Sequence, residues 1–155
     1  MHNRNDAFGA WGDDIPIRLD AVLRTWRRML ENELPWRTMP LDDAFGDVRG
    51  ILHELFNEGR QPDGVHRREQ LRTVARSHGA FRRSQQCTAE HIAYEVEVLA
   101  CAIECVLRQS GAAAGFVEDA LVVLRAGLRD VTRDAMLAWA GRGEWTARWD
   151  EHRAY

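Results

Sequence analysis

Lysine is absent from the sequence, and all 21 basic residues are arginine. A Walker-type phosphate loop, a Schiff-base enzyme and a protein kinase each depend on a lysine at the reacting site. The absence of lysine therefore excludes these three classes of protein. Serine is nearly as scarce, and Ser77, Ser84 and Ser110 form no Gly-x-Ser-x-Gly elbow and no serine–histidine dyad. We therefore expect no catalytic residues and a protein that is not an enzyme.

Cysteine is also rare. Cys87, Cys101 and Cys105 are too few and too clustered for the disulfide framework of a small secreted protein, and their odd number leaves one thiol unpaired. The first fifteen residues contain acids, asparagines and glycines in place of an apolar run, which argues against a signal peptide or a membrane span there. Both absences favour a cytoplasmic protein with no membrane partner.

An excess of positive charge is missing as well, because the formal net charge at pH 7 is -3. Proteins dedicated to nucleic acids gain most of their affinity by neutralising phosphates with basic patches. The arginine pairs of this chain are short and have acids nearby. We therefore expect no nucleic-acid partner.

Apolar residues make up 45% of the 155 residues, and they recur three and four positions apart. This spacing predicts a single all-α bundle of about five main helices. Thr88 is a plausible N-cap, and Pro35 is expected to end the first helix. The predicted helices span 16–34, 41–56, 65–83, 88–109 and 113–140. They form a domain over 15–140, between a flexible segment 1–14 and a tail or linker 141–155.

The predicted fourth helix has two apolar stripes, one beginning at Ile92 and another that holds Tyr94 and Val98. A helix that is apolar on two sides is either central in a bundle or shared with a second subunit. The long fifth helix has heptad-like apolar spacing, which is typical of an element that reaches beyond the core. We expect a homodimer, whose interface draws on Tyr94, Val98, Leu124, Leu128 and Val131. Tryptophans near helix ends, which are candidates for the same kind of surface, are Trp11, Trp36, Trp145 and Trp149.

No metal site is predicted. His53-Glu54 begins like a zinc-protease helix, but Asn57 stands where the second histidine is required. No glutamate is followed three residues later by a histidine, as di-iron bundles require. His91 and Glu95 lie one turn apart, and we interpret them as a polar pair at a helix edge.

The thiols are candidate redox residues. Cys101 and Cys105 are one turn apart and could bind a soft metal or respond to oxidation. Their place on an apolar stripe favours the simpler interpretation that they are small hydrophobic side chains. Cys87, near a helix start, is the more reactive candidate.

His78 and Arg82 lie on the apolar face of the third helix, and Glu95 borders the apolar face of the fourth. Buried polar groups need partners, so the three residues predict a polar network between these helices. The network either fixes the packing register or senses a ligand, proton or partner, because a histidine beside a carboxylate can switch near neutral pH. The sequence leaves both interpretations open.

The segment 78–82, His-Gly-Ala-Phe-Arg, followed by Ile92, Glu95 and Leu99, resembles the helical N-terminal domain of RsbR-type stressosome proteins, which also precedes many bacterial histidine kinases. That family carries a histidine–glycine pair, an arginine four residues later and a glutamate seventeen residues after the histidine. The chain departs from the pattern at Gln86-Cys87, where the family has Gly-Tyr, and at Ala100, where arginine is common.

The resemblance implies a globin-like fold without haem, usually dimeric, that relays signals through its last helix. We therefore expect a non-catalytic sensory and dimerisation module of bacterial signal transduction, in a stress response or a histidine-kinase system. Its partners would be a signalling effector domain or protein, a second copy, and a small apolar ligand. One alternative is a haem-binding sensor globin with His78 or His91 as axial ligand. A small-molecule enzyme built from His78, Arg82 and Glu95 is a further alternative.

Overall fold

In this computed structural model the described residues are 15–39, 41–57 and 64–141, and they form an all-helical protein with no β-strand among them. The all-α class predicted from the sequence is confirmed. The predicted segment 1–14 and nearly all of the predicted tail, with Trp11, Trp145 and Trp149, lie outside the described residues. The elements are α2 (Ile15–Leu30), η1 (Trp36–Thr38), α3 (Leu41–Asn57), α4 (Gly64–Ser84), α5 (Ala89–Gln109) and α6 (Ala114–Trp139).

Helix α5 begins at a capping box. The Thr88 hydroxyl accepts a hydrogen bond from the His91 backbone N–H, and the Thr88 backbone N–H donates to His91 Nδ1. Two of the N–H groups that a helix start leaves unpaired are thereby satisfied. At the other end Gly111 has φ +77°, a left-handed conformation that glycine adopts without strain, and the chain reverses into α6. The predicted N-cap is confirmed.

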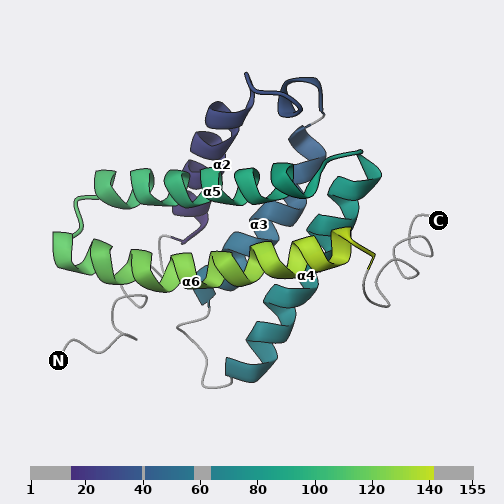
Figure 1. The fold of residues 1–155 in the computed structure, drawn as a ribbon. Coiled ribbons are helices and arrows are strands. Elements are labelled where there is room, and N and C mark those ends of the chain that lie inside the picture. Colours follow the sequence, from purple (N-terminus) through teal and green to yellow (C-terminus); the bar gives the residue numbers. More distant parts are fainter. Residues whose placement is uncertain (1–14, 40, 58–63, 142–155) are drawn as a thin grey trace.

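The helices form two layers (Figure 1). Helices α5 and α6 lie side by side, and α2, α3 and α4 pass behind them at steep angles. Helix α6 packs against both α4 and α5, while α2 packs against α5, and α3 against α4. The core between the layers contains the apolar stripe predicted for α5: Ile92, Val96, Leu99, Ile103 and Val106. Among the described helices, none is both long and apolar enough to cross a membrane.

The crossing of α4 and α6 depends on Gly79. A Cβ atom added to Gly79 would lie 1.9 Å from the backbone oxygen of Ala135. No side chain fits at that distance, so only glycine allows the two backbones to approach so closely. Helix α4 is continuous through this position, because the tight packing on α6 outweighs the low helix propensity of glycine.

Helix α2 ends at Leu30, which corrects the predicted end beside Pro35. The chain turns over 31–35, and η1 then places Trp36 in the core, where the residue is 2% exposed. The prediction that Trp36 belongs to a surface is therefore wrong. Its position near a helix end suggested exposure, but the turn folds the indole back against α5.

Most of the predicted dimer face is buried within one chain. Leu124, Leu128 and Val131 are at most 3% exposed, and Val98 is 8% exposed. The heptad-like stripe of α6 packs against the helices of its own chain, because α6 lies against both α4 and α5. These four residues are therefore corrected to core positions. Tyr94, at 43% exposed, is the one member of the predicted set on the surface.

Candidate functional site

His78, Arg82 and Glu95 meet inside the protein. The first two lie one turn apart on α4, and Glu95 comes from the facing side of α5. Each is at most 2% exposed. The polar side chains predicted to meet between these two helices, α4 and α5, are therefore in contact. Burial of charge is costly unless each charge finds a partner.

The Arg82 guanidinium holds the Glu95 carboxylate at two points. Arg82 Nε donates to Glu95 Oε2 at 2.9 Å, and Arg82 Nη2 donates to Glu95 Oε1. Arg82 Nη1 donates to Gln85 Oε1 at 2.7 Å. A guanidinium matches a carboxylate in this two-point geometry, so the ion pair is both strong and directional.

His78 lies between two carboxylates. Its Nε2 atom is 3.4 Å from Glu95 Oε2, and its Nδ1 atom is 3.9 Å from Asp47 Oδ2. Nδ1 is buried and has no hydrogen-bond partner among the described residues. One imidazole nitrogen is thus paired, while the other faces an acid without a bond.

Asp47, on α3, was not among the residues that sequence reasoning selected. It lies four residues before the buried Ile51, at the edge of the apolar stripe of its helix. That position is an ordinary one for an exposed acid. Only the packing of α3 on α4 shows that its carboxylate, 24% exposed, faces His78.

The two acids respond to this environment in opposite directions. Burial alone would raise the pKa of Glu95, but His78 and Arg82 outweigh it and lower the pKa to about 2. For Asp47, burial is the largest effect, and its pKa is raised although His78 and Arg82 oppose the rise. Glu95 is therefore a firmly ionised partner, and Asp47 is the acid that resists ionisation.

Two tryptophans connect the surrounding elements to this cluster. Trp26, completely buried on α2, donates from its indole Nε1 to the Glu95 backbone oxygen at 3.3 Å. Trp139, at the end of α6, donates to the Cys87 backbone oxygen at 2.7 Å. The Arg83 guanidinium lies over the Trp139 ring, 5.6 Å from its centroid. Helices α2 and α6 are thus fixed to the α4–α5 corner that carries the cluster.

The three thiols differ from the expectations. Cys87 is 4% exposed, its Sγ lies 3.6 Å from Met39 Sδ, and burial raises the pKa of its thiol. Its selection as the most reactive thiol is therefore wrong. Cys101 is exposed and Cys105 is partly exposed, so the interpretation of this pair as buried hydrophobic side chains is also corrected. The second stripe of α5 therefore faces solvent at these two positions.

His91 and Tyr94 lie near the N-terminal end of α5, and their rings contact Trp36. The His91 ring meets the Trp36 ring edge-on at 5.7 Å, and the Tyr94 ring is tilted against it at 5.4 Å. A side-chain hydrogen bond with Glu33 raises the pKa of Tyr94. The predicted His91–Glu95 edge pair is wrong, because His91 caps the helix and Glu95 points into the core.

The cluster brings two acids, one histidine and one arginine together where α3, α4 and α5 meet. In the part of the chain that the structure describes, no group of three or more histidine, cysteine or carboxylate side chains is placed to hold a metal ion. Comparison with known proteins found no family model, no curated protein and no solved structure that matches this chain.

Proposed function

We propose that this chain is a non-catalytic sensory or regulatory module of bacterial signal transduction, similar to the N-terminal domain of RsbR-type proteins. The observation that carries the proposal is the buried cluster of His78, Arg82, Glu95 and Asp47, which joins α3, α4 and α5. A purely structural core at this place would be served by apolar side chains at lower desolvation cost.

The signal is a change in the charge or contacts of His78. In the neutral ring a proton on Nε2 faces Glu95, which leaves the Nδ1 lone pair toward Asp47. Protonation of Nδ1 gives Asp47 a donor and draws α3 toward α4. Histidine is the side chain that ordinarily makes this change near neutral pH. A ligand or protein that approaches Asp47 from solvent would act on the same contact.

Helix α6 relays the change to an effector. His78 is the neighbour of Gly79, where the α4 backbone touches Ala135 of α6. A close-packed contact transmits a displacement, because there is no free space between the two backbones in which one could move alone. The output is a noncovalent contact of α6 or of the chain beyond it with a signalling protein.

The test is a pH titration of the full chain by NMR between pH 5 and 8. We expect the backbone amides of α6 around Ala135, which the α4 backbone touches, to shift over this pH interval. In His78→Gln the α6 shifts disappear, whereas His53→Gln, at an exposed histidine, preserves them. Amides of α6 that stay unchanged from pH 5 to pH 8 in the wild-type chain would reduce the cluster to a packing device.

Haem binding is the alternative with less support. His78 has Glu95 on one side and Asp47 on the other, and His91 uses Nδ1 in the helix cap. An axial bond from His78 would break contacts that the buried acids need. We expect no Soret shift when haemin is added; a shift that His78→Ala abolishes would establish the globin alternative.

An enzyme built on the cluster has less support still. A general base must reach its substrate within hydrogen-bond distance. His78, Arg82 and Glu95 are at most 2% exposed, so a substrate could reach them only after the helices open. Native mass spectrometry of the purified chain tests both alternatives, because a retained metabolite, metal or haem appears as added mass.

A further inference from the structure

Two thiols lie one turn apart on the outer surface of α5. Cys101 is exposed, Cys105 is partly exposed, and both are free of disulfide bonds. Free cysteine is among the most buried residue types, because its sulfur packs as a small hydrophobic group and reacts where solvent reaches it. Packing therefore does not explain these two residues, which we call the α5 thiol pair. The buried cluster does not explain them either, because Glu95 points from α5 into the core.

The helix determines how far apart the two sulfurs can lie. Side chains four residues apart on a helix have Cβ atoms about 5–6 Å apart. A disulfide requires Cβ atoms about 3.8 Å apart, so a direct bond between Cys101 and Cys105 would distort α5. A metal ion between two thiolates needs a wider spacing. With each bond about 2.3 Å long, the two sulfurs of a linear complex lie about 4.6 Å apart. The α5 thiol pair therefore suits a bridging ion better than a disulfide.

Polar contacts around the α5 thiol pair leave its sulfurs available. Gln109 Nε2 donates a hydrogen bond to Cys105 Sγ at 3.5 Å, which favours the thiolate form that binds metals. The carboxylate of Glu104, next to Cys105 in the chain, binds Arg108 and Arg125, each at 2.8 Å. Because two arginines hold this acid, its charge does not compete with the thiols for a cation.

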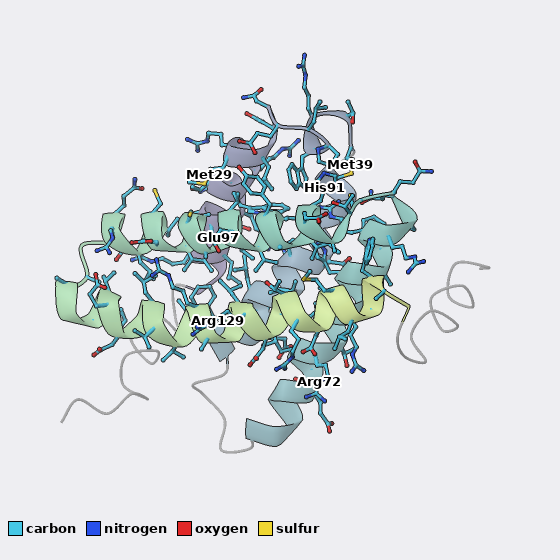
Figure 2. All side chains as sticks on the ribbon, in the orientation of Figure 1. Met29, Met39, Arg72, His91, Glu97 and Arg129 are labelled. Carbon is cyan, nitrogen blue, oxygen red and sulfur yellow. The ribbon has the colours of Figure 1, made fainter. Side chains whose placement is uncertain are left out.

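The number of ligands selects the kind of ion. Glu97, one turn before Cys101, lines a hollow between α5 and α6 together with Arg129 (Figure 2). Among the described residues, no histidine or carboxylate joins the two thiols as a third ligand. Zn²⁺ takes four ligands in structural sites, and Ca²⁺ and Mg²⁺ take oxygens. Soft sulfur ligands select Cu(I), whose filled d shell suits a complex with two ligands.

We propose that the α5 thiol pair is a binding site for one soft monovalent metal ion, Cu(I). Cys101 Sγ and Cys105 Sγ are its two ligands, and a single helix provides both. On binding, the S–H bond of each thiol breaks, two S–Cu bonds form and two protons pass to solvent, while copper keeps its oxidation state. The site shares no residue with the buried cluster, so it goes beyond the proposed function and does not depend on it.

Titration of the full chain with Cu(I) tests the site. Ascorbate in the absence of oxygen keeps the copper monovalent, and the coloured chelator bicinchoninate competes for it. We expect one ion per chain, ultraviolet charge-transfer absorption from thiolate to copper, and an X-ray absorption spectrum with two sulfur neighbours. An equal amount of Zn²⁺ should not displace the copper, because the pair offers only half of the ligands that zinc requires.

Cys101→Ser and Cys105→Ser should each weaken Cu(I) binding at least about a hundredfold. The loss of a direct ligand costs more than the loss of an outer-shell partner, which costs about 10–100-fold. The matched control Cys105→Ser/Arg108→Cys keeps the number of thiols but places two of them about 10 Å apart along α5, so it should lose binding to the same extent. Cys87→Ala and His78→Gln should bind as the wild type does. Circular dichroism verifies that each variant is folded.

Full affinity in either single serine variant overturns the proposal, and so does loss of binding in Cys87→Ala. A wild-type chain that takes no copper from bicinchoninate overturns it as well. Native mass spectrometry that finds two chains per copper ion contradicts it, because each chain would then supply one thiol. Binding by the variant with separated thiols contradicts the one-turn spacing. None of these measurements involves the pH response of α6, so the copper site and the sensing function fail separately.

Discussion

At the scale of single residues, the structure depends on whether each buried charge keeps its partner. Arg82 is completely buried, and an arginine side chain keeps its positive charge. Its burial in the core therefore depends on the ion pair with Glu95. Removing the acid leaves a buried cation without compensation, which costs more than the pair itself contributes. His78 and Asp47 complete this cluster.

Glu95→Ala tests this dependence. We expect the free energy of unfolding to fall by about 3 kcal/mol or more, because Arg82 loses both carboxylate contacts inside the protein. Urea denaturation measures the loss. Glu69→Ala, at an exposed glutamate of α4, should change it by less than about 0.5 kcal/mol. Similar values for the two variants would mean that water reaches Arg82.

The same carboxylate predicts a pH dependence. The pKa of Glu95 falls from its ordinary value of 4.5 to about 2 in the folded protein, so folding favours the ionised form. Its contribution is complete above about pH 4.5 and is lost as the pH falls toward 2. The difference in unfolding free energy between wild type and Glu95→Gln should therefore shrink over that interval. A difference that stays constant from pH 6 to pH 2.5 would contradict the lowered pKa.

At the scale of elements, the cluster is positioned by how α4 crosses α6. The small residue that allows the crossing, Gly79, is the immediate neighbour of His78. A change in the separation of these helices therefore moves the α4 segment that bears both His78 and Arg82. The capping box at Thr88 defines where α5 starts, and hence which of its side chains point toward α4.

Two glycine-to-alanine substitutions separate this contact from helix propensity. Gly79→Ala should lower the free energy of unfolding by about 3 kcal/mol or more, because the new methyl group meets the Ala135 backbone oxygen. Gly115→Ala, in the first turn of α6 with nothing within 4 Å, should raise it by up to about 1 kcal/mol. Thermal and urea unfolding measure both. A higher free energy of unfolding in both variants would show that the backbones of α4 and α6 separate easily.

At the scale of the whole molecule, α6 is the helix that holds α4 and α5 together. It packs against α4 and α5. Its last residue, Trp139, donates a hydrogen bond to the loop between those two helices. Its inner stripe fills the core, while residues on its outer side line two hollows that it shares with α5. A single helix thus connects the core with the outer surface of the molecule.

The thiols report on opening of the molecule as a whole. We expect an excess of a thiol reagent to modify Cys101 rapidly in the native protein, because it is exposed, and Cys87 only when the α4–α5 corner opens. In a Cys101→Ser/Cys105→Ser variant, Cys87 labelling should be slow and should accelerate with denaturant. Fast labelling of Cys87 in native buffer would be inconsistent with its burial beside Met39 and Trp139.

The periodicity of the apolar residues determined the helical class, the approximate helix bounds and the core stripe of α5, because a helix repeats every 3.6 residues wherever it packs. It also indicated His78, Arg82 and Glu95, since polar residues inside an apolar stripe need one another. Tertiary structure alone decided the rest. Asp47 joined the cluster, Trp36 turned inward, Cys101 stayed exposed, and the stripe predicted for a dimer was used within the chain. Periodicity shows which face of a helix is apolar, but only packing shows what covers that face.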